Sequence, residues 1–114
     1  MKTIDADQLR QFIAADRRGP VVNVLDKSDY EAKHIPGSIN IPVGGDNFTD
    51  RISSHVQTKD TPVVVYCASR ECDASERAAK QLENAGFTNV QDYAPGVKGW
   101  ENKGYQLQGT AVSS

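Results

Sequence analysis

Two cysteines five positions apart, Cys67 and Cys72, are the residues of this sequence whose type and spacing are best suited to chemistry. Cys67 directly follows an apolar run at 63–66, and a helical pattern begins near Asp73. The connection must therefore curl from the end of a strand to the start of a helix, where unpaired backbone N–H groups form an anion-binding concavity. We expect Cys67 at the rim or floor of this concavity, with a lowered pKa and a nucleophilic thiolate.

A free cysteine at the end of a strand is also a common small hydrophobic residue of protein cores. The strand–loop–helix context by itself leaves both interpretations of Cys67 open. Arg70 would either steer an anionic donor or be a solvated loop charge. If the thiol is reactive, the binding loop and its rim consist of Ala68, Ser69, Arg70, Glu71, Cys72 and Asp73.

The segments on either side of this loop have clear patterns. Three valines and a tyrosine at 63–66 form a continuous apolar run, which is typical of a strand buried on both faces in a parallel sheet. Asp73 followed three positions later by Glu76 is a capping-box signature, and alanines and Leu82 then recur at helical spacing. Capping explains these two carboxylates more simply than a role in acid–base catalysis.

The rest of the chain alternates predicted helices with predicted strands. Capping boxes that start at Asp5 and Ser28 indicate two helices, an apolar run at 21–25 with one polar break indicates a central strand, and 90–93 is assigned as the last strand. This order predicts an α/β fold in which helices cover both faces of a small parallel β-sheet and ligands bind at the carboxyl ends of its strands. Further predicted features are a minor strand at 38–42, a helix containing Phe48, Ile52 and Val56, and a left-handed helix end at Gly86 with Phe87 as its hydrophobic contact.

Length and composition are those of one globular domain. The chain has 114 residues, 38% of them hydrophobic and 25% charged, and we assign 1–110 to the domain and 111–114 to a polar tail, with fraying from Gly109. The net charge of −2 lacks the basic character of a nucleic-acid-binding protein. No signal-peptide core or membrane-spanning run is present, so we expect a cytoplasmic protein that does not bind membranes. No exposed apolar stripe is evident, and we expect a monomer.

The histidines and the tryptophan are expected to have ordinary structural roles. His34 should hydrogen-bond the backbone of its own turn, and His55 should be solvated on a helix. Two histidines and two loop cysteines have neither the number nor the spacing of a zinc site, so no metal is predicted. A cysteine protease would need a histidine beside Cys67, and the sequence does not place one there. Trp100 is expected to anchor the C-terminal turn in the core rather than to contact a ligand.

Motifs along nearly the whole chain follow one another in a specific order. They are His34-Ile35-Pro36-Gly37-Ser38-Ile39-Asn40-Ile41-Pro42, the valine-rich strand into Tyr66-Cys67, Ala85-Gly86-Phe87, Asn89-Val90 and Gly96-Val97-Lys98-Gly99-Trp100. In this arrangement the chain resembles the single-domain rhodanese (sulfurtransferase) family. The resemblance implies that Cys67 takes a sulfane sulfur from a thiosulfate-like donor as a persulfide and passes it to cyanide or to a small-molecule or protein thiol. It implies no metal and no organic cofactor.

The chain departs from the family at two places. Asn23-Val24-Leu25 stands where the family has Asp-Val-Arg at the end of a strand, and we interpret this change as a rearranged support around the site. Cys72 stands where sulfurtransferases have an arginine five residues after the cysteine, and the following helix begins about two residues late. The longer loop is expected to widen the anion-binding concavity.

Two other functions remain open on the same fold. Phosphatases and arsenate reductases related to the family hold a tetrahedral oxyanion with a cysteine, five residues and an arginine. Asp73 occupies that arginine position and would repel phosphate, and Arg70 comes too early to replace the arginine. A catalytically silent binding or redox-sensing module is the other alternative.

Cys72 also has two interpretations. A tight loop can bring cysteines five positions apart to the Cα–Cα distance of about 4.4–6.8 Å that a disulfide needs. Cys72 is therefore a candidate resolving thiol, which would convert a Cys67 persulfide or sulfenate into an internal disulfide. The alternative is a buried thiol that closes the start of the following helix.

Overall fold

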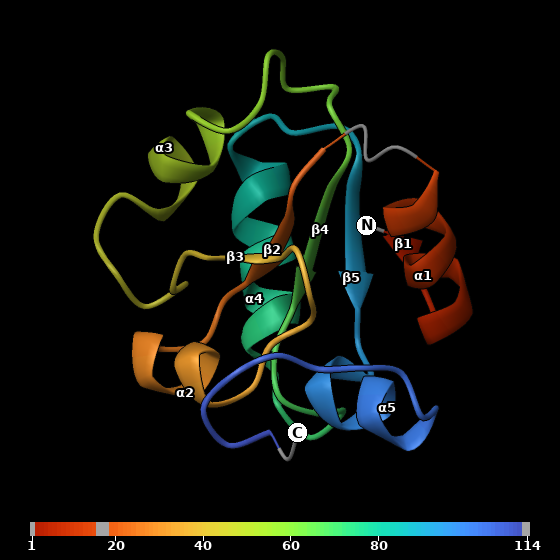
Figure 1. Ribbon diagram of the computed structural model, residues 1–114. Coiled ribbons are helices and arrows are strands. Elements are labelled where there is room, and N and C mark those ends of the chain that lie inside the picture. Colours follow the sequence, from red (N-terminus) through yellow and green to blue (C-terminus); the bar gives the residue numbers. More distant parts are fainter. Residues whose placement is uncertain (1, 16–18, 113–114) are drawn as a thin grey trace.

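The computed structural model describes residues 2–15 and 19–112, which form five strands and five helices in alternating order (Figure 1). The strands are β1 (Lys2–Thr3), β2 (Val21–Asn23), β3 (Ile39–Asn40), β4 (Val63–Tyr66) and β5 (Val90–Tyr93), and the helices are α1 (Ala6–Ala14), α2 (Lys27–Ala32), α3 (Phe48–Ser53), α4 (Ala74–Asn84) and α5 (Gly96–Asn102).

The five strands form one sheet in the order β1-β5-β4-β2-β3, and every neighbouring pair is parallel. β4 lies at the centre between β5 and β2, and all four of its side chains are buried. The short strand β1, which the sequence patterns did not indicate, adds to the outer edge of β5. The predicted α/β fold with a small parallel sheet is confirmed.

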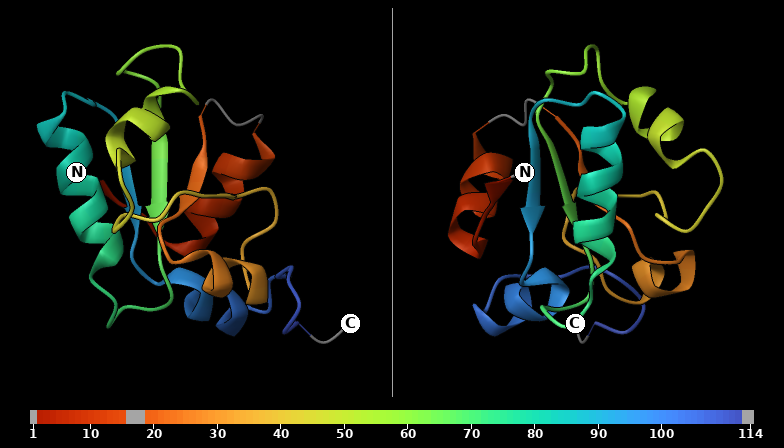
Figure 2. Two further views of the ribbon diagram at one scale, coloured as in Figure 1. Left: turned by 90° about the vertical axis from the view of Figure 1, so that its left-hand side faces the viewer. Right: turned by 180° about the vertical axis from the view of Figure 1, so that it is seen from behind.

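Helices cover both faces of the sheet, and Figure 2 shows α1 on one side and α4 on the other. One hydrophobic core packs α3 and α4 against the sheet and includes Leu82 and Val65. A second core packs α1 and α5 against the opposite face and includes Leu9 and Val64. Consecutive valines of β4 thus enter different cores, which is why this strand is apolar at every position.

Helix α1 begins at its predicted capping box. Asp5 Oδ1 accepts the backbone N–H of Gln8 at 2.8 Å, and Gln8 Oε1 accepts the backbone N–H of Asp5 at 2.9 Å. The capping boxes predicted at Ser28 and Asp73 are wrong. Helix α2 begins one residue before Ser28 and has Asp26 as its N-cap residue.

Asp73 does precede α4, but its backbone lies at φ −94° and ψ 3°, outside the extended region from which a side chain normally caps a helix. Its carboxylate instead pairs with Arg77 Nε at 3.2 Å. Glu76, the other half of the predicted box, pairs with Lys80 at 3.2 Å. Both carboxylates are therefore partners in exposed i,i+4 pairs, each of which contributes about 0.2–0.5 kcal/mol to helix stability.

Two helix ends test the remaining local predictions. Gly86 follows α4 with a left-handed φ of +97° and Phe87 is buried, so the predicted end of this helix is confirmed. Helix α3 ends at Ser53, which is earlier than predicted. Val56 therefore packs against the core from the turn after α3, and His55 is exposed in that turn rather than on a helix.

The C-terminal segment is held against α2 as far as the structure describes it. The backbone N–H groups of Thr110 and Ala111 donate to the carbonyl oxygens of Glu31 and Ala32, at 2.9 and 3.0 Å. These carbonyls end a helix and have no partner within it, so the segment satisfies them. The predicted fraying from Gly109 is wrong for residues 109–112, whereas 113–114 lie outside the described residues.

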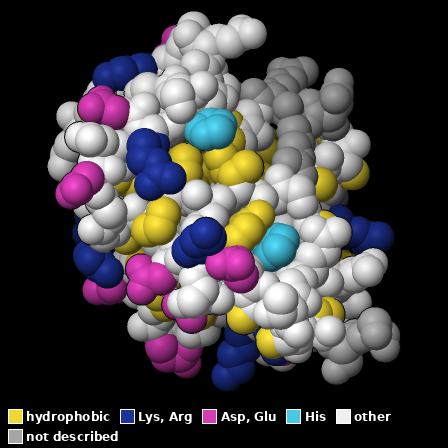
Figure 3. Space-filling model, turned by 60° about the vertical axis from the view of Figure 1, so that its left-hand side comes forward, with side chains coloured by type: hydrophobic (Ala, Val, Ile, Leu, Met, Phe, Trp, Pro, Cys, Tyr) yellow, Lys and Arg dark blue, Asp and Glu magenta, His cyan; other side chains and the backbone are white. Residues whose placement is uncertain are grey.

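The surface adds two observations. On the face shown in Figure 3, hydrophobic side chains reach the surface in several separate areas with charged side chains between them. Among the described residues, no helix combines the length and the apolar content that crossing a membrane requires.

Candidate functional site

Cys67 lies where the sequence predicted it, directly after the central strand β4 and before the loop that leads into α4. The carboxyl ends of parallel strands are the usual position of functional sites in α/β folds. Helix α5 lies close to this end of the sheet (Figure 1). The loop and α5 therefore define the candidate site.

The start of α5 is bonded to the cysteine loop. The backbone N–H of Val97 donates to the Cys67 carbonyl oxygen at 3.0 Å, and that of Lys98 donates to the Ala68 carbonyl oxygen at 2.9 Å. Gly96 allows this approach, because a Cβ at position 96 would lie 2.4 Å from the Cys67 carbonyl oxygen. Trp100 is a core anchor as predicted, with its indole Nε1 donating to the Gln106 carbonyl oxygen at 2.9 Å.

The sulfur of Cys67 is fully buried. Three oxygens are placed to accept a hydrogen bond from it: the Cys72 carbonyl at 3.3 Å, the Ser75 hydroxyl at 3.7 Å and the Ser69 carbonyl at 3.9 Å. Burial raises the pKa of the Cys67 thiol, and the neighbouring Cys72 thiol raises it further, while Ser75 partly opposes both effects. The expected lowering of the Cys67 pKa is therefore wrong for this conformation, although a backbone hydrogen bond from Ser75 does reach the sulfur and favours the thiolate.

The path of the loop explains this difference. The loop turns back on itself through a bond from the Cys72 N–H to the Ser69 carbonyl oxygen, at 3.1 Å. This turn uses the Cys72 N–H and directs the Cys72 carbonyl oxygen toward the sulfur. Carbonyl oxygens accept a hydrogen bond from a thiol but repel a thiolate. The closed loop therefore favours the protonated form of Cys67.

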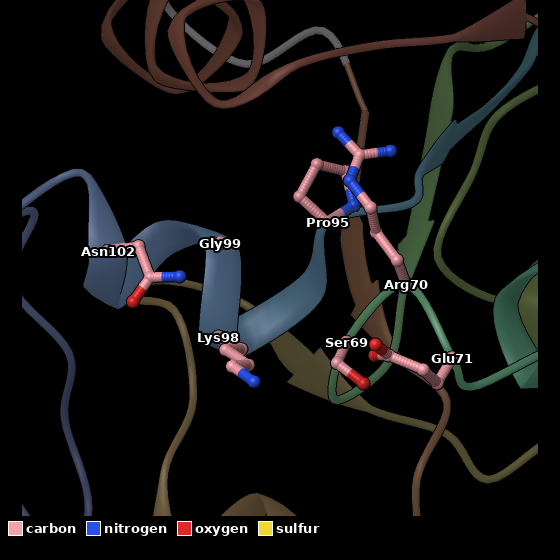
Figure 4. Close-up of a pocket in the computed structure, with 7 residues that line it drawn as sticks. All are labelled: Ser69, Arg70, Glu71, Pro95, Lys98, Gly99 and Asn102. Atoms are coloured by element: carbon pink, nitrogen blue, oxygen red, sulfur yellow. The ribbon is translucent and has the colours of Figure 1, made fainter.

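The other predicted loop residues form the outer rim. Ser69 and Cys72 are half-buried, and Ala68, Arg70, Glu71 and Asp73 are exposed. A cavity of about 170 Å³ lies between the loop and α5 (Figure 4), and it is lined by Ser69, Arg70, Glu71, Pro95, Lys98, Gly99 and Asn102.

Charged side chains of both signs surround this cavity. Figure 4 shows the Glu71 carboxylate beside Ser69, with Lys98 across the cavity and the Arg70 side chain extending along Pro95. A backbone hydrogen bond of its own residue lowers the pKa of Glu71, and Ser69 and the positive charge of Lys98 lower it further. The cavity therefore offers two cations and one carboxylate to a small polar molecule that approaches the loop.

The structure brings Cys67 and Cys72 together. Both are free thiols, and Cys72 packs against the same hydrophobic core that contains Cys67. The Cys72 carbonyl oxygen lies 3.3 Å from the Cys67 sulfur, and the Cys72 thiol is close enough to raise the pKa of Cys67.

Two buried polar residues near the sulfur were missed by the sequence patterns. Ser75 is 2% exposed and Asp92 is 4% exposed. Ser75 stands among the alanines at the start of α4, and Asp92 lies between Gln91 and the buried Tyr93 in β5. A charged residue inside a predicted buried strand is the signal that could have identified Asp92.

The turn around His34 supports the site from the side. His34 Nδ1 lies 2.7 Å from the Tyr30 carbonyl oxygen and its ring stacks on Tyr30, so the predicted bond to the local backbone is confirmed. Tyr66, the last residue of β4, accepts the backbone N–H of Ile35 at 3.1 Å and contacts the Ser38 hydroxyl at 2.7 Å. This turn is therefore fixed to the strand that ends at Cys67.

The end of β2 differs from the family pattern and is held by amides. Asn23 Oδ1 accepts the backbone N–H of Leu25 at 2.9 Å, and Asn40 Nδ2 donates to the Asn23 carbonyl oxygen at 3.1 Å. Within residues 2–15 and 19–112, no group of three His, Cys, Asp or Glu side chains is placed to hold a metal ion.

Comparison with known proteins matches this architecture. Residues 5–103 match the family model described as the rhodanese-like domain. The chain is 30% identical over 93 residues to the adenylyltransferase and sulfurtransferase uba4 of Ogataea parapolymorpha, covering 80% of this chain and 22% of that protein. It is 26% identical over 100 residues to YrkF of Bacillus subtilis, covering 88% of this chain and 51% of YrkF. This chain thus spans about half or less of these two relatives.

A solved structure gives the same result for the fold. The rhodanese-like domain of the Alr3790 protein from Anabaena superposes with a TM-score of 0.82 at 27% identity, covering 97% of this chain and 81% of that one.

Proposed function

The chain belongs to the rhodanese-like domain family, and from that membership we propose that it transfers sulfane sulfur through Cys67. The observation that carries the proposal is the position of Cys67 at the carboxyl end of β4, on a loop bonded to α5. The relative uba4, whose name includes sulfurtransferase, supports the same class of reaction. The thiosulfate-like donor, the thiol or cyanide acceptor, the cytoplasmic location and the monomeric state are parts of this proposal.

The reaction has two balanced halves. The Cys67 thiolate attacks the sulfane sulfur of thiosulfate, forms a persulfide S–S bond and releases sulfite with the electron pair of the broken bond. An acceptor thiolate or cyanide then attacks the terminal sulfur, and the Cys67 thiolate leaves. No metal or organic cofactor takes part. Arg70 and Lys98 supply positive charge beside the loop for an anionic donor.

The buried sulfur requires the loop to open before transfer. The contacts that close the loop over Cys67 are the turn bond from the Cys72 N–H to the Ser69 carbonyl oxygen and weak contacts from the sulfur to oxygens. None of these involves a buried ion pair, so a donor that binds at the rim can displace them at modest cost. Opening also exposes the sulfur to water and lowers the pKa that burial had raised.

A silent binding or redox-sensing module is the second candidate function, and the burial of Cys67 is the observation that favours it. A phosphatase is disfavoured, because Asp73 at the arginine position pairs with Arg77 at 3.2 Å on the exposed side of α4.

Intact mass after incubation with thiosulfate tests the proposal. We expect one added sulfur atom on the wild type, its removal by cyanide with formation of thiocyanate, and no addition to Cys67→Ser. The same samples should release no phosphate from an aryl phosphate. A wild-type protein that gains no sulfur at neutral or alkaline pH would identify the silent module instead.

A further inference from the structure

Two polar side chains are buried on the elements that flank Cys67. Ser75 lies at the start of α4 and is 2% exposed, and Asp92 lies in β5 and is 4% exposed. A carboxylic acid is almost never buried to this extent unless it is paired or has a function.

Ser75 is in contact with the thiol and interacts with the acid. The Cys67 Sγ–H donates to Ser75 Oγ at 3.7 Å. Burial raises the pKa of Asp92, and a side-chain hydrogen bond from Ser75 partly opposes that effect. Asp92 Oδ1 is buried and has no hydrogen-bond partner within the described residues, so the acid keeps an oxygen available to accept or share a proton.

The surroundings of Asp92 offer it little compensation for a charge. The strands on either side place Val65 and Thr3 opposite it, neither of which ionises. Glu76 of α4 repels a charge on Asp92 and raises the Asp92 pKa further. The remaining ionisable group in contact with Ser75 is Cys67 itself. Two acids that share a buried site titrate as a coupled pair, because a second negative charge there is costly.

We propose that Asp92, acting through the Ser75 hydroxyl, controls whether Cys67 carries a proton. With Asp92 ionised, Ser75 donates to the carboxylate and accepts from the thiol, and Cys67 stays protonated. With Asp92 neutral, its O–H donates to Ser75 Oγ and the Ser75 hydroxyl turns to donate to the Cys67 thiolate. Asp92 and Ser75 are thus positioning residues, and their role in sulfur transfer rests on the proposed function.

The two arrangements interconvert without any other reactant. The Cys67 proton moves to Ser75 Oγ while the Ser75 proton moves to an Asp92 oxygen, so one S–H bond breaks and one carboxyl O–H bond forms. The total charge stays at minus one. Because the charge is moved rather than created, the cost of burying it is shared between the two sites. The proton transfer to Asp92 therefore provides a Cys67 thiolate inside a pocket that otherwise disfavours the charged form.

The test is the ionisation of Cys67 itself, which needs no sulfur transfer. Thiolate ultraviolet absorbance is followed against pH in a Cys72→Ser background, with the matching Cys67→Ser protein subtracted. Asp92→Asn removes the competing negative charge and keeps the side-chain shape. We expect the Cys67 pKa to fall by about one unit or more. When Ser75 is also replaced by alanine, Asp92→Asn should lower the Cys67 pKa by less than half as much.

Glu76→Gln is the matched control, since it removes a carboxylate from the same helix end at an exposed position. It should shift the Cys67 pKa far less than Asp92→Asn does, because water screens exposed charges. An Asp92→Asn protein with an unchanged titration curve would overturn the proposal. Equal shifts with and without the Ser75 hydroxyl, or an equal shift from Glu76→Gln, would show a general field effect and would overturn the role of Ser75.

The titration and the sulfur-transfer assay test the two proposals separately. A protein that shows the expected pKa shift but gains no sulfur from thiosulfate would retain the Asp92–Ser75–Cys67 coupling and lose the sulfurtransferase assignment.

Discussion

Gly96 lies so close to Cys67 that a Cβ on it would be 2.4 Å from the Cys67 carbonyl oxygen. The contact joins the start of α5 to the end of β4, two elements that are far apart in the sequence. The geometry of the cysteine loop therefore depends on a residue outside it.

Gly96→Ala should destabilise the protein and disturb the loop. The φ of Gly96 is +65°, which costs a residue with a side chain about 1–2 kcal/mol, and the overlap with backbone atoms adds about 1–3 kcal/mol. Urea unfolding measures the loss. Gly104→Ala is the matched control, because Gly104 has a φ of +79° but nothing within 4 Å of a Cβ. If both variants lose the same stability, the close packing of Gly96 against the Cys67 loop contributes nothing to the free energy of unfolding.

Asp5→Ala should cost about 1 kcal/mol of stability through loss of the capping box of α1. Asp26→Ala is a control of the same residue type at an N-cap, since no side-chain capping bond is present at that described helix start. We expect a clearly smaller loss of stability for the control in urea unfolding. Equal losses would mean that the capping bonds of Asp5 are not what stabilises α1.

Alkylation of Cys67 should be slow at neutral pH. The thiolate is the reactive form, and burial raises the pKa of Cys67, so the rate should keep rising above the ordinary thiol pKa of about 8.5. The same shift affects stability. The folded state holds the proton more tightly than the unfolded state, so this contribution is fully present below about pH 8.5 and is lost as the pH rises through the higher folded value.

Mass spectrometry of the Cys67 peptide after timed iodoacetamide treatment gives the rate at each pH. Free cysteine under the same conditions is the reference. Rapid labelling at mildly acid pH would contradict the thiol state that the closed loop indicates.

Cys72→Ser should make oxidation of Cys67 irreversible. In the wild type, peroxide converts Cys67 to a sulfenic acid, and attack by the Cys72 thiol then forms a disulfide and releases water. Intact mass should show the loss of two hydrogens, which dithiothreitol reverses. In the variant a second peroxide should oxidise the sulfenic acid to the sulfinic acid, which adds two oxygens in total and is not reversed by dithiothreitol. Unchanged peroxide sensitivity and unchanged turnover in Cys72→Ser would show that Cys72 does not resolve Cys67.

Lys98→Ala should raise the KM for thiosulfate by about threefold to tenfold with little change in kcat, because it removes a positive charge that acts before the chemical step. Lys103→Ala is the control, since Lys103 lies just beyond the same helix and pairs with Asp7 at 3.5 Å. The KM difference should shrink at high salt. Equal effects of the two substitutions would remove Lys98 from donor binding.

The sequence by itself determined the features that depend on local patterns. The apolar run at 63–66 identified the buried central strand, Asp5 and Gln8 identified the start of α1, and Gly86 identified the end of α4. Each of these is settled by residues within a few positions of one another, where side-chain spacing and backbone preference act directly. The position of Cys67 after β4 followed from the same patterns.

Only the tertiary structure decided the chemical state of that cysteine. Whether N–H groups or carbonyl oxygens face the sulfur depends on how the loop folds back and how α5 holds it, which spacing along the chain does not encode. The link to Asp92 requires β5 and α4 to meet behind the loop. Solvent access and the pKa of a buried group are set by atoms from distant segments, and these segments come together only when the chain folds.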